Sequence, residues 1–196
     1  MSAAAVQLTA ARAAAAMAGS LVAGPADAVI GGVSIDTRTL RAGDVYIAII
    51  GDRLDGHRFV GEALRAGAAG VVVSDRSSVP PGLGPAIVAV QVDDTTRALQ
   101  RLARHIRRAS GAQVVAITGS AGKTTTKEIT ADLLGARYRV FRTQGNFNNH
   151  IGLPLSLLEL RHGPEIAVVE LGMNHAGEIR LLVDLAEPDV RVWTLV

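Results

Sequence analysis

The sequence predicts an α/β fold: a small mixed α/β N-terminal domain, then a second domain with a parallel sheet that is truncated at its C-terminus. Three observations lead to this prediction. Short apolar runs alternate with segments of helical periodicity throughout the 196 residues. In the second half this alternation is regular, which indicates a parallel sheet with helices on both faces. The final residues, Val192–Val196, form an apolar strand that lacks cover, so we expect the natural chain to continue.

The first half is expected to contain short strands and helices in alternation. Strands are predicted over residues 29–36, 45–50, 71–73 and 87–90, and helices from residue 9 and over residues 57–66 and 96–108. Thr9 suits the N-terminal cap of the first helix, because its hydroxyl can accept a hydrogen bond from a free backbone N–H. Gly67 suits the C-terminal cap of the second. Asp93, Asp94 and Thr95 supply oxygens that can cap the third.

The second half has a more regular pattern. Strands are predicted over residues 114–118, 138–141, 166–171 and 190–196, and helices over residues 124–134, 153–160 and 178–186. Pro154 suits the first turn of the middle helix, where a backbone N–H is not needed. We place the domain boundary near Ser110-Gly111, which divides the chain into residues 1–110 and 111–196.

The composition excludes several classes of protein. Hydrophobic residues make up 48% and charged residues 19%, so the chain is not mainly disordered. The net charge of +2 is too small for bulk binding of a polyanion, so no nucleic-acid partner is expected. The absence of cysteine excludes a disulfide scaffold, a thiolate metal site and a cysteine nucleophile.

The alanine-rich segment at residues 3–18 is expected to be a helix rather than a signal peptide. Gln7, Thr9 and Arg12 interrupt its apolar run, and no basic segment precedes it. No stretch approaches the ~20 apolar residues that a membrane span needs. We therefore expect a soluble, cytoplasmic, monomeric protein with no membrane partner.

A glycine-rich segment between a predicted strand and a predicted helix indicates phosphate binding. Its residues are Gly119, Ser120, Ala121, Gly122, Lys123, Thr124 and Thr125. Glycines let backbone N–H groups surround phosphate oxygens, and the helix N-terminus adds partial positive charge. Lys123 can reach the outer phosphates of ATP, and Thr124 can bind Mg²⁺. Ile117 stands where the longer form of this motif has its first glycine. The alternative is a glycine-rich turn whose lysine is only solvated.

Glu170 ends an apolar run in the same half of the chain. Because parallel strands bring their C-terminal ends to one edge, we expect Glu170 close to the phosphate-binding segment, as a carboxylate that holds Mg²⁺ directly or through water. The alternative is an exposed or helix-capping carboxylate. Lys127, one helical turn after Lys123, is expected on the surface.

Three amides follow the second strand of this half. Asn146, Asn148 and Asn149 offer hydrogen-bond donors and acceptors without charge, and are expected to hold a substrate carboxylate or a transferring phosphoryl group. The alternative is a turn-rich loop without a ligand. His150 and His175 are expected to be supporting or surface residues rather than metal ligands.

These motifs together resemble the ATP-dependent Mur ligases of peptidoglycan synthesis. The segment ITGSAGKTTTKE (117–128) resembles their phosphate-binding loop. NFNNHIGLP (146–154) and ELGMNHAGEI (170–179) resemble the family member that adds D-alanyl-D-alanine. In the first half, DTR (36–38) and GDRLDGHRF (51–59) resemble its UDP-sugar-peptide domain.

This resemblance implies that the N-terminal domain binds the UDP end of a substrate through Asp36, Thr37 and Arg38, with Thr37 where the family often has serine. A guanidinium group such as that of Arg38 suits a diphosphate, because it can donate two hydrogen bonds at once. The alternative is a structural Asp–Arg turn. The loop at 51–59 is expected to contact the sugar-peptide, with His57 capping the following helix.

The resemblance also implies a reaction for the complete protein. ATP would phosphorylate the terminal carboxylate of UDP-N-acetylmuramoyl tripeptide, and the amine of D-alanyl-D-alanine would displace the phosphate. Lys123 and Glu170 would be catalytic, with Mg²⁺ on Thr124 and Glu170. Because further family features would lie beyond Val196, we expect this chain alone to be inactive. The alternatives are a sister ligase, including a folylpolyglutamate-synthetase-like enzyme, a regulatory P-loop ATPase, or a module that only binds UDP-substrate.

Overall fold

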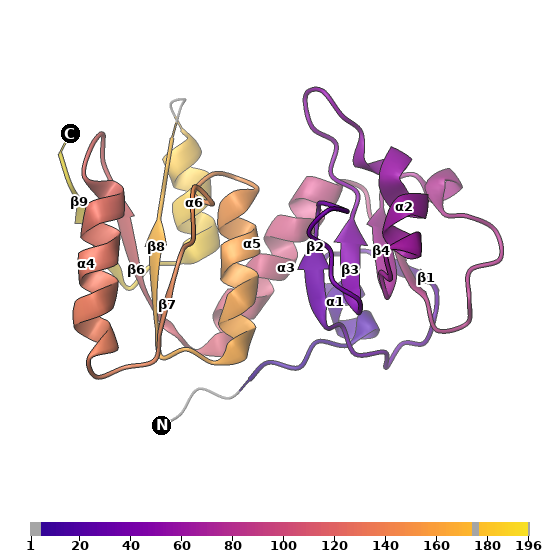
Figure 1. Cartoon of the computed structure of the whole chain (residues 1–196), viewed down its shortest axis with the longest axis horizontal. Helices are drawn as coiled ribbons and strands as arrows, with labels where there is room; N and C mark the ends of the chain where they lie inside the picture. Colours follow the sequence, from indigo (N-terminus) through magenta and orange to yellow (C-terminus); the bar gives the residue numbers. More distant parts are fainter. Residues whose placement is uncertain (1–4, 174–176, 196) are drawn as a thin grey trace. The chain divides into compact units, whose positions relative to one another are not determined.

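Figure 1 shows two α/β units in a computed structural model that describes residues 5–173 and 177–195. Residues 7–102 form one unit, and the described residues from 103 onward form the other, together with residues 5 and 6. Helix α3 (Thr95–Ser110) leads from the first unit into the second. Each unit has its own sheet with mostly parallel strands, which confirms the predicted α/β fold class.

The first unit has a five-stranded sheet with the order β1-β5-β4-β3-β2. Strands β2 to β5 pair in parallel, and the edge strand β1 pairs antiparallel with β5. The elements are α1 (Ala10–Ala16), β1 (Ser20–Ala23), β2 (Gly32–Ser34), β3 (Asp44–Ile47), η1 (Gly56–Phe59), α2 (Val60–Arg65), β4 (Gly70–Val73), η2 (Arg76–Ser78) and β5 (Val88–Gln91). The segments that follow β2, β3 and β4 therefore leave the sheet at the same edge.

Local contacts explain where these elements begin and how they pack. Thr9 caps α1 by accepting a hydrogen bond from the N–H of Arg12 at 3.4 Å, as predicted. Asp94 accepts from the N–H of Arg97 at 2.9 Å at the start of α3. All of β4 is buried, and its apolar side chains pack with Tyr46 of β3 and with α2.

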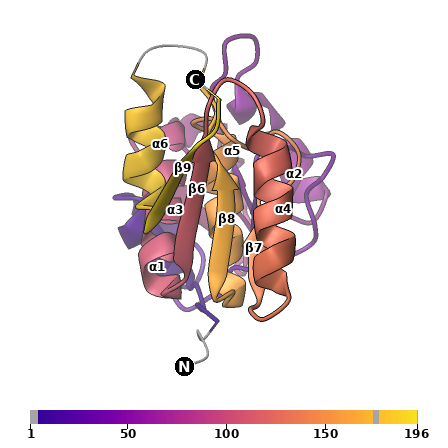
Figure 2. The ribbon, with the colours of Figure 1, turned by 90° about the vertical axis from the view of Figure 1, so that its left-hand side faces the viewer.

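The second unit has four parallel strands in the order β7-β8-β6-β9. Its elements after α3 are β6 (Gln113–Thr118), α4 (Lys123–Gly135), β7 (Val140–Arg142), α5 (Gly152–Leu158), η3 (Glu159–His162), β8 (Ile166–Glu170), α6 (Glu178–Ala186) and β9 (Val190–Trp193). Figure 2 shows α4 on one side of this sheet and α6 on the other. Ile117, Ile166 and Val168 pack beneath α4 against Ala131. The register pairs Ile117 with Glu170, so β6 and β8 end side by side.

Two features of the first sheet differ from the sequence prediction. Strand β1 was not predicted, and the strand predicted over residues 29–36 is paired only over Gly32–Ser34. The physical reason for the early end is a local turn: the hydroxyl of Ser34 donates to the carbonyl of Asp36 and accepts from its N–H. At the other end, Val29 is 57% exposed and makes only an isolated bridge to Thr9.

Across the part of the chain that the structure describes, no helix is long and apolar enough to cross a membrane.

Candidate functional site

The glycine-rich segment connects the end of β6 to the start of α4, as predicted, and we call Gly119–Thr124 the phosphate loop. Gly119 and Gly122 have φ values of +142° and +81°, which residues other than glycine rarely adopt. A Cβ on Gly119 would also lie 2.2 Å from the hydroxyl oxygen of Thr194. Glycine is therefore required at position 119 for two separate reasons.

The two residues after β9 lie against the phosphate loop and hold its shape. The hydroxyl of Thr194 contacts the carbonyl oxygens of Ala121 and Thr118, the latter at 3.2 Å. The carbonyl of Leu195 accepts from the N–H of Ser120 at 2.7 Å. Sequence reasoning did not identify Thr194, because no pattern around it marks a partner that lies so far away along the chain.

Lys123 turns back onto its own loop. Its Nζ donates to the carbonyl of Gly119 at 2.8 Å and lies 3.5 Å from that of Ser120. These carbonyl contacts hold the ammonium group beside the loop, where a bound phosphate could replace them with a charged partner.

Glu170 lies beside the phosphate loop, as predicted. The residue is 4% exposed, and its carboxylate accepts hydrogen bonds from the hydroxyl of Thr124 at 2.9 Å and the side-chain amide of Asn148 at 2.8 Å. Both partners are neutral, and among the described residues Glu170 forms no salt bridge. A buried carboxylate without a cation is costly, so this position fits a divalent ion.

The donor set is suited to Mg²⁺ rather than to a transition metal. A carboxylate and a hydroxyl supply oxygen ligands, and Mg²⁺ keeps several waters and often takes few ligands from the protein. Within residues 5–173 and 177–195, no group of three or more His, Asp or Glu side chains lies close enough to hold a metal alone. Thr124 and Glu170 would therefore share the ion with water and phosphate oxygens.

The three asparagines have different positions. The side chain of Asn148 donates to Glu170, and the backbone carbonyl of Asn148 accepts from the N–H of Gly172 at 2.8 Å. Asn149 faces the start of α5 instead, where its Oδ1 accepts from the N–H groups of Ile151 at 3.1 Å and Gly152 at 2.8 Å. Asn146 is exposed. The structure thus brings Asn148, and not Asn149, to the carboxylate, while a ligand contact by any of the three stays a prediction.

The prediction that Lys127 lies on the surface is wrong. Its side chain is among the largest that are fully buried, and Nζ donates to the carbonyl of Thr143 at 2.7 Å and pairs with Glu128 at 2.9 Å. Hydrogen bonds from Lys127 and then from Arg142 lower the pKa of Glu128. Because the partner of Lys127 is a backbone carbonyl, no residue type in the sequence signals this contact.

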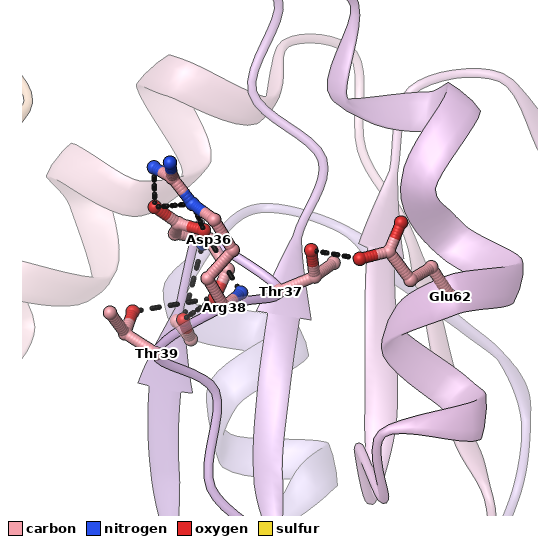
Figure 3. Close-up of polar contacts among 6 residues, drawn as sticks. Asp36, Thr37, Arg38, Thr39 and Glu62 are labelled. Carbon is pink, nitrogen blue, oxygen red and sulfur yellow. Dashed lines mark hydrogen bonds and ion pairs between the residues drawn. The ribbon is translucent and has the colours of Figure 1, made fainter.

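In the first unit, Asp36, Thr37 and Arg38 form a turn after β2, shown in Figure 3. Nη2 and Nε of Arg38 donate to the carboxylate of Asp36 at 2.5 and 2.9 Å, and these bonds lower the pKa of Asp36 to about 2. The hydroxyl of Thr37 donates to Glu62 of α2 at 2.6 Å. Arg38 is thus oriented by Asp36 while its side chain stays 83% exposed, so it keeps donors for an anionic ligand.

The loop after β3 follows at the same edge. Asp55, rather than His57, caps η1, because its carboxylate accepts from the N–H of His57 at 2.9 Å. The prediction that His57 is the cap is therefore wrong. Its ring is instead 8% exposed and contacts Asp55 and the start of the segment after β4. His175 lies outside the described residues, and His150 is exposed.

Comparisons with known proteins identify relatives of both units. The family model described as "Mur ligase family, catalytic domain" matches residues 29–107, and that described as "Mur ligase middle domain" matches residues 117–196. The UDP-N-acetylmuramoyl-tripeptide–D-alanyl-D-alanine ligase of Bacillus subtilis is 49% identical over 85% of this chain and 36% of its own length. That of Escherichia coli is 40% identical over 84% of this chain and 35% of its own length.

Solved structures give the same result. The crystal structure of MurF from Acinetobacter baumannii has a TM-score of 0.85 and 34% identity, over 96% of this chain and 40% of that one. MurF ligase from Thermotoga maritima in complex with ADP has a TM-score of 0.73 and 38% identity, over 85% of this chain and 38% of that one. The chain thus spans a little over a third of the length of these relatives.

Proposed function

The chain belongs to the Mur ligase family, and from this we propose that it supplies the UDP-substrate-binding and ATP-binding parts of a UDP-N-acetylmuramoyl-tripeptide–D-alanyl-D-alanine ligase. We assign the UDP-substrate domain to residues 1–110 and the ATP domain to residues 111–196. The proposed location is the cytoplasm and the proposed state a monomer, without nucleic-acid or membrane partners.

One observation carries the nucleotide part of this proposal. A buried carboxylate, Glu170, has neutral partners alone among the residues that the structure describes, and it accepts from Thr124 at the start of the helix that follows the phosphate loop. A structural carboxylate at this depth would be expected to have a cationic partner. ADP in the complex of the Thermotoga maritima relative is consistent with a nucleotide at this loop.

The proposed reaction is amide ligation with release of ADP and phosphate. The terminal carboxylate of the tripeptide attacks the γ-phosphorus of ATP, ADP leaves, and an acyl phosphate forms. The amine of D-alanyl-D-alanine then attacks the carbonyl carbon, phosphate leaves, and the amine gives up a proton. Activation is needed because a carboxylate is a poor electrophile.

The chain's contribution to phosphoryl transfer is binding and orientation. The backbone N–H groups of the phosphate loop and the ammonium of Lys123 hold the phosphates. Thr124 and Glu170 would hold Mg²⁺, which neutralises phosphate charge when it is bound. Asn148 orients Glu170 by donating to its second carboxylate oxygen. In the first unit, Asp36, Thr37 and Arg38 would bind the UDP end of the substrate.

The test measures ADP release by a complete ligase that carries this chain. With UDP-N-acetylmuramoyl tripeptide present, ADP release should require D-alanyl-D-alanine. It should not occur when a single amino acid, glutamate included, replaces that dipeptide. The variant Lys123→Ala should lose most of this activity. ADP release that is independent of both substrates would indicate a regulatory ATPase, and near-normal ligation by Lys123→Ala would contradict the assignment.

A further inference from the structure

The side chain of His57 is a buried link between two segments of the first unit. Its Nδ1 lies 2.7 Å from Oδ1 of Asp55, in the loop after β3. Its Nε2 lies 2.9 Å from the backbone nitrogen of Ser74 and 3.4 Å from that of Asp75, both just after β4. The ring thus joins the base of one loop to the end of the neighbouring strand.

The partners determine where the proton of the ring lies. A backbone N–H can only donate, so Nε2 must carry a lone pair to accept from Ser74. The proton of the neutral ring is then on Nδ1, where it is donated to the carboxylate of Asp55. Asp55 remains an acceptor, because hydrogen bonds from the backbone and then the ring of His57 lower its pKa.

The loop that His57 holds is closed by backbone contacts between its two sides. Ile50 and Asp55 form an antiparallel bridge, and the N–H of Gly51 donates to the carbonyl of Leu54 at 2.9 Å. At its base, the N–H of Gly56 donates to the carbonyl of Ile49 at 2.9 Å.

A second buried side chain supports the base. The hydroxyl of Tyr46 donates to the carbonyl of Gly56 at 3.1 Å. Burial first, and then the nearby carboxylates, raise the pKa of Tyr46 to about 12, so this hydroxyl keeps its proton. Tyr46 holds the base of the loop to β3, whereas His57 holds it to β4, and the two contacts have separate targets.

We propose that His57 is a positioning residue for UDP-substrate binding: its neutral ring holds the loop Gly51–Gly56 against the end of β4. This inference rests on the proposed function, in which the UDP end of the substrate binds at this edge of the sheet. The link to Ser74 is the contact that matters, and the contact with Asp55 sets the tautomer that makes it possible.

Two amide variants, each of which matches the position of one ring nitrogen, separate the two contacts of His57. In His57→Gln the side-chain oxygen can reach the position of Nε2 and accept from Ser74, but the contact with Asp55 is lost. In His57→Asn the amide matches Nδ1 and keeps the contact with Asp55, but cannot reach Ser74. His57→Phe keeps the shape of the ring and removes both.

The first measurement is hydrogen exchange at the amides of Gly51 and Gly56 in the 196-residue chain. We expect faster exchange in His57→Asn and His57→Phe, and near-normal exchange in His57→Gln. The second is calorimetric titration with UDP-N-acetylmuramoyl tripeptide, where the dissociation constant should rise about tenfold for Asn and Phe, as for loss of one hydrogen bond, and little for Gln. Binding of ATP at the other unit should not change.

A third measurement needs no variant. Nitrogen NMR of the wild-type ring should show a proton on Nδ1 and none on Nε2. A protonated Nε2, or normal loop exchange in both His57→Asn and His57→Phe, would overturn the inference. Absence of UDP-substrate binding by the wild type would contradict the proposed function, and the exchange and ring measurements would still decide the role of His57.

Discussion

Replacing Gly119 by alanine should destabilise the second unit and disturb the phosphate loop. The backbone there has φ of +142°, and residues with a Cβ hold such conformations at a cost of about 1–3 kcal/mol. The added methyl group would also lie 2.2 Å from the hydroxyl oxygen of Thr194 and 2.9 Å from the carbonyl oxygen of Leu195. Moving the Thr194 hydroxyl away breaks its hydrogen bonds, at a cost of about 0.5–1.5 kcal/mol.

These effects together lower the free energy of unfolding by about 1.5–4.5 kcal/mol. Gly135 provides a matched control in the same helix-loop element, because it is helical and a Cβ there would meet nothing within 4 Å. Gly135→Ala should therefore stabilise the fold, by up to about 1 kcal/mol. The two alanine variants thus differ in sign.

Urea unfolding followed by far-UV circular dichroism measures both variants. In a protein that already carries Thr194→Ala, Gly119→Ala should cost less than in the wild type, since the hydroxyl and its hydrogen bonds are already gone and only the backbone strain is added. If Gly119→Ala is as stable as the wild type, neither the φ value nor the contact with Thr194 constrains this loop, and the reasoning is refuted.

Two further predictions concern buried and paired charges. Lys127→Met should lower the free energy of unfolding by about 1–3 kcal/mol in urea, because the fully buried carbonyl contact with Thr143 loses its donor. Lys123→Met should have a smaller effect, because the contact that it loses, with the carbonyl of Gly119, is only partly buried. Equal effects of the two would contradict this. Arg38→Gln should return the pKa of Asp36 from about 2 towards 3.8 in a carboxyl NMR titration. Because the pKa of Asp36 is lowered in the fold, the wild-type pair stabilises the folded state above pH 3.8, and this stabilisation is lost as the pH falls through about 2. An Asp36 titration that is unchanged in Arg38→Gln would show that Arg38 is not the partner of Asp36.

The elements that the sequence predicted well are those with a local signal. An apolar strand, two glycines and a lysine determine the β6–loop–α4 element, and parallel topology alone places Glu170 at its edge. Strand β1 has only four residues, at an antiparallel sheet edge, and lacks such a signal.

The side-chain contacts that could not be predicted depend on distant backbone groups. Lys127 and Thr194 each contact backbone carbonyls, and His57 accepts from the N–H of Ser74. Every residue has a backbone carbonyl, and every residue except proline a backbone N–H, so residue types alone do not reveal these partners. A charged side chain such as Lys127 is therefore assigned to the surface unless the fold is known.

The most direct test of a magnesium–nucleotide site at the phosphate loop and Glu170 is a titration of the ¹⁵N-labelled chain with ATP, with and without Mg²⁺. NMR detects weak binding, so this titration can be made on the 196-residue chain by itself. We predict that the largest amide shifts lie at Gly119–Thr125, and that Mg²⁺ strengthens ATP binding in the wild type but not in Glu170→Gln. Shifts that avoid this loop, or an equal effect of Mg²⁺ in both proteins, would contradict the site.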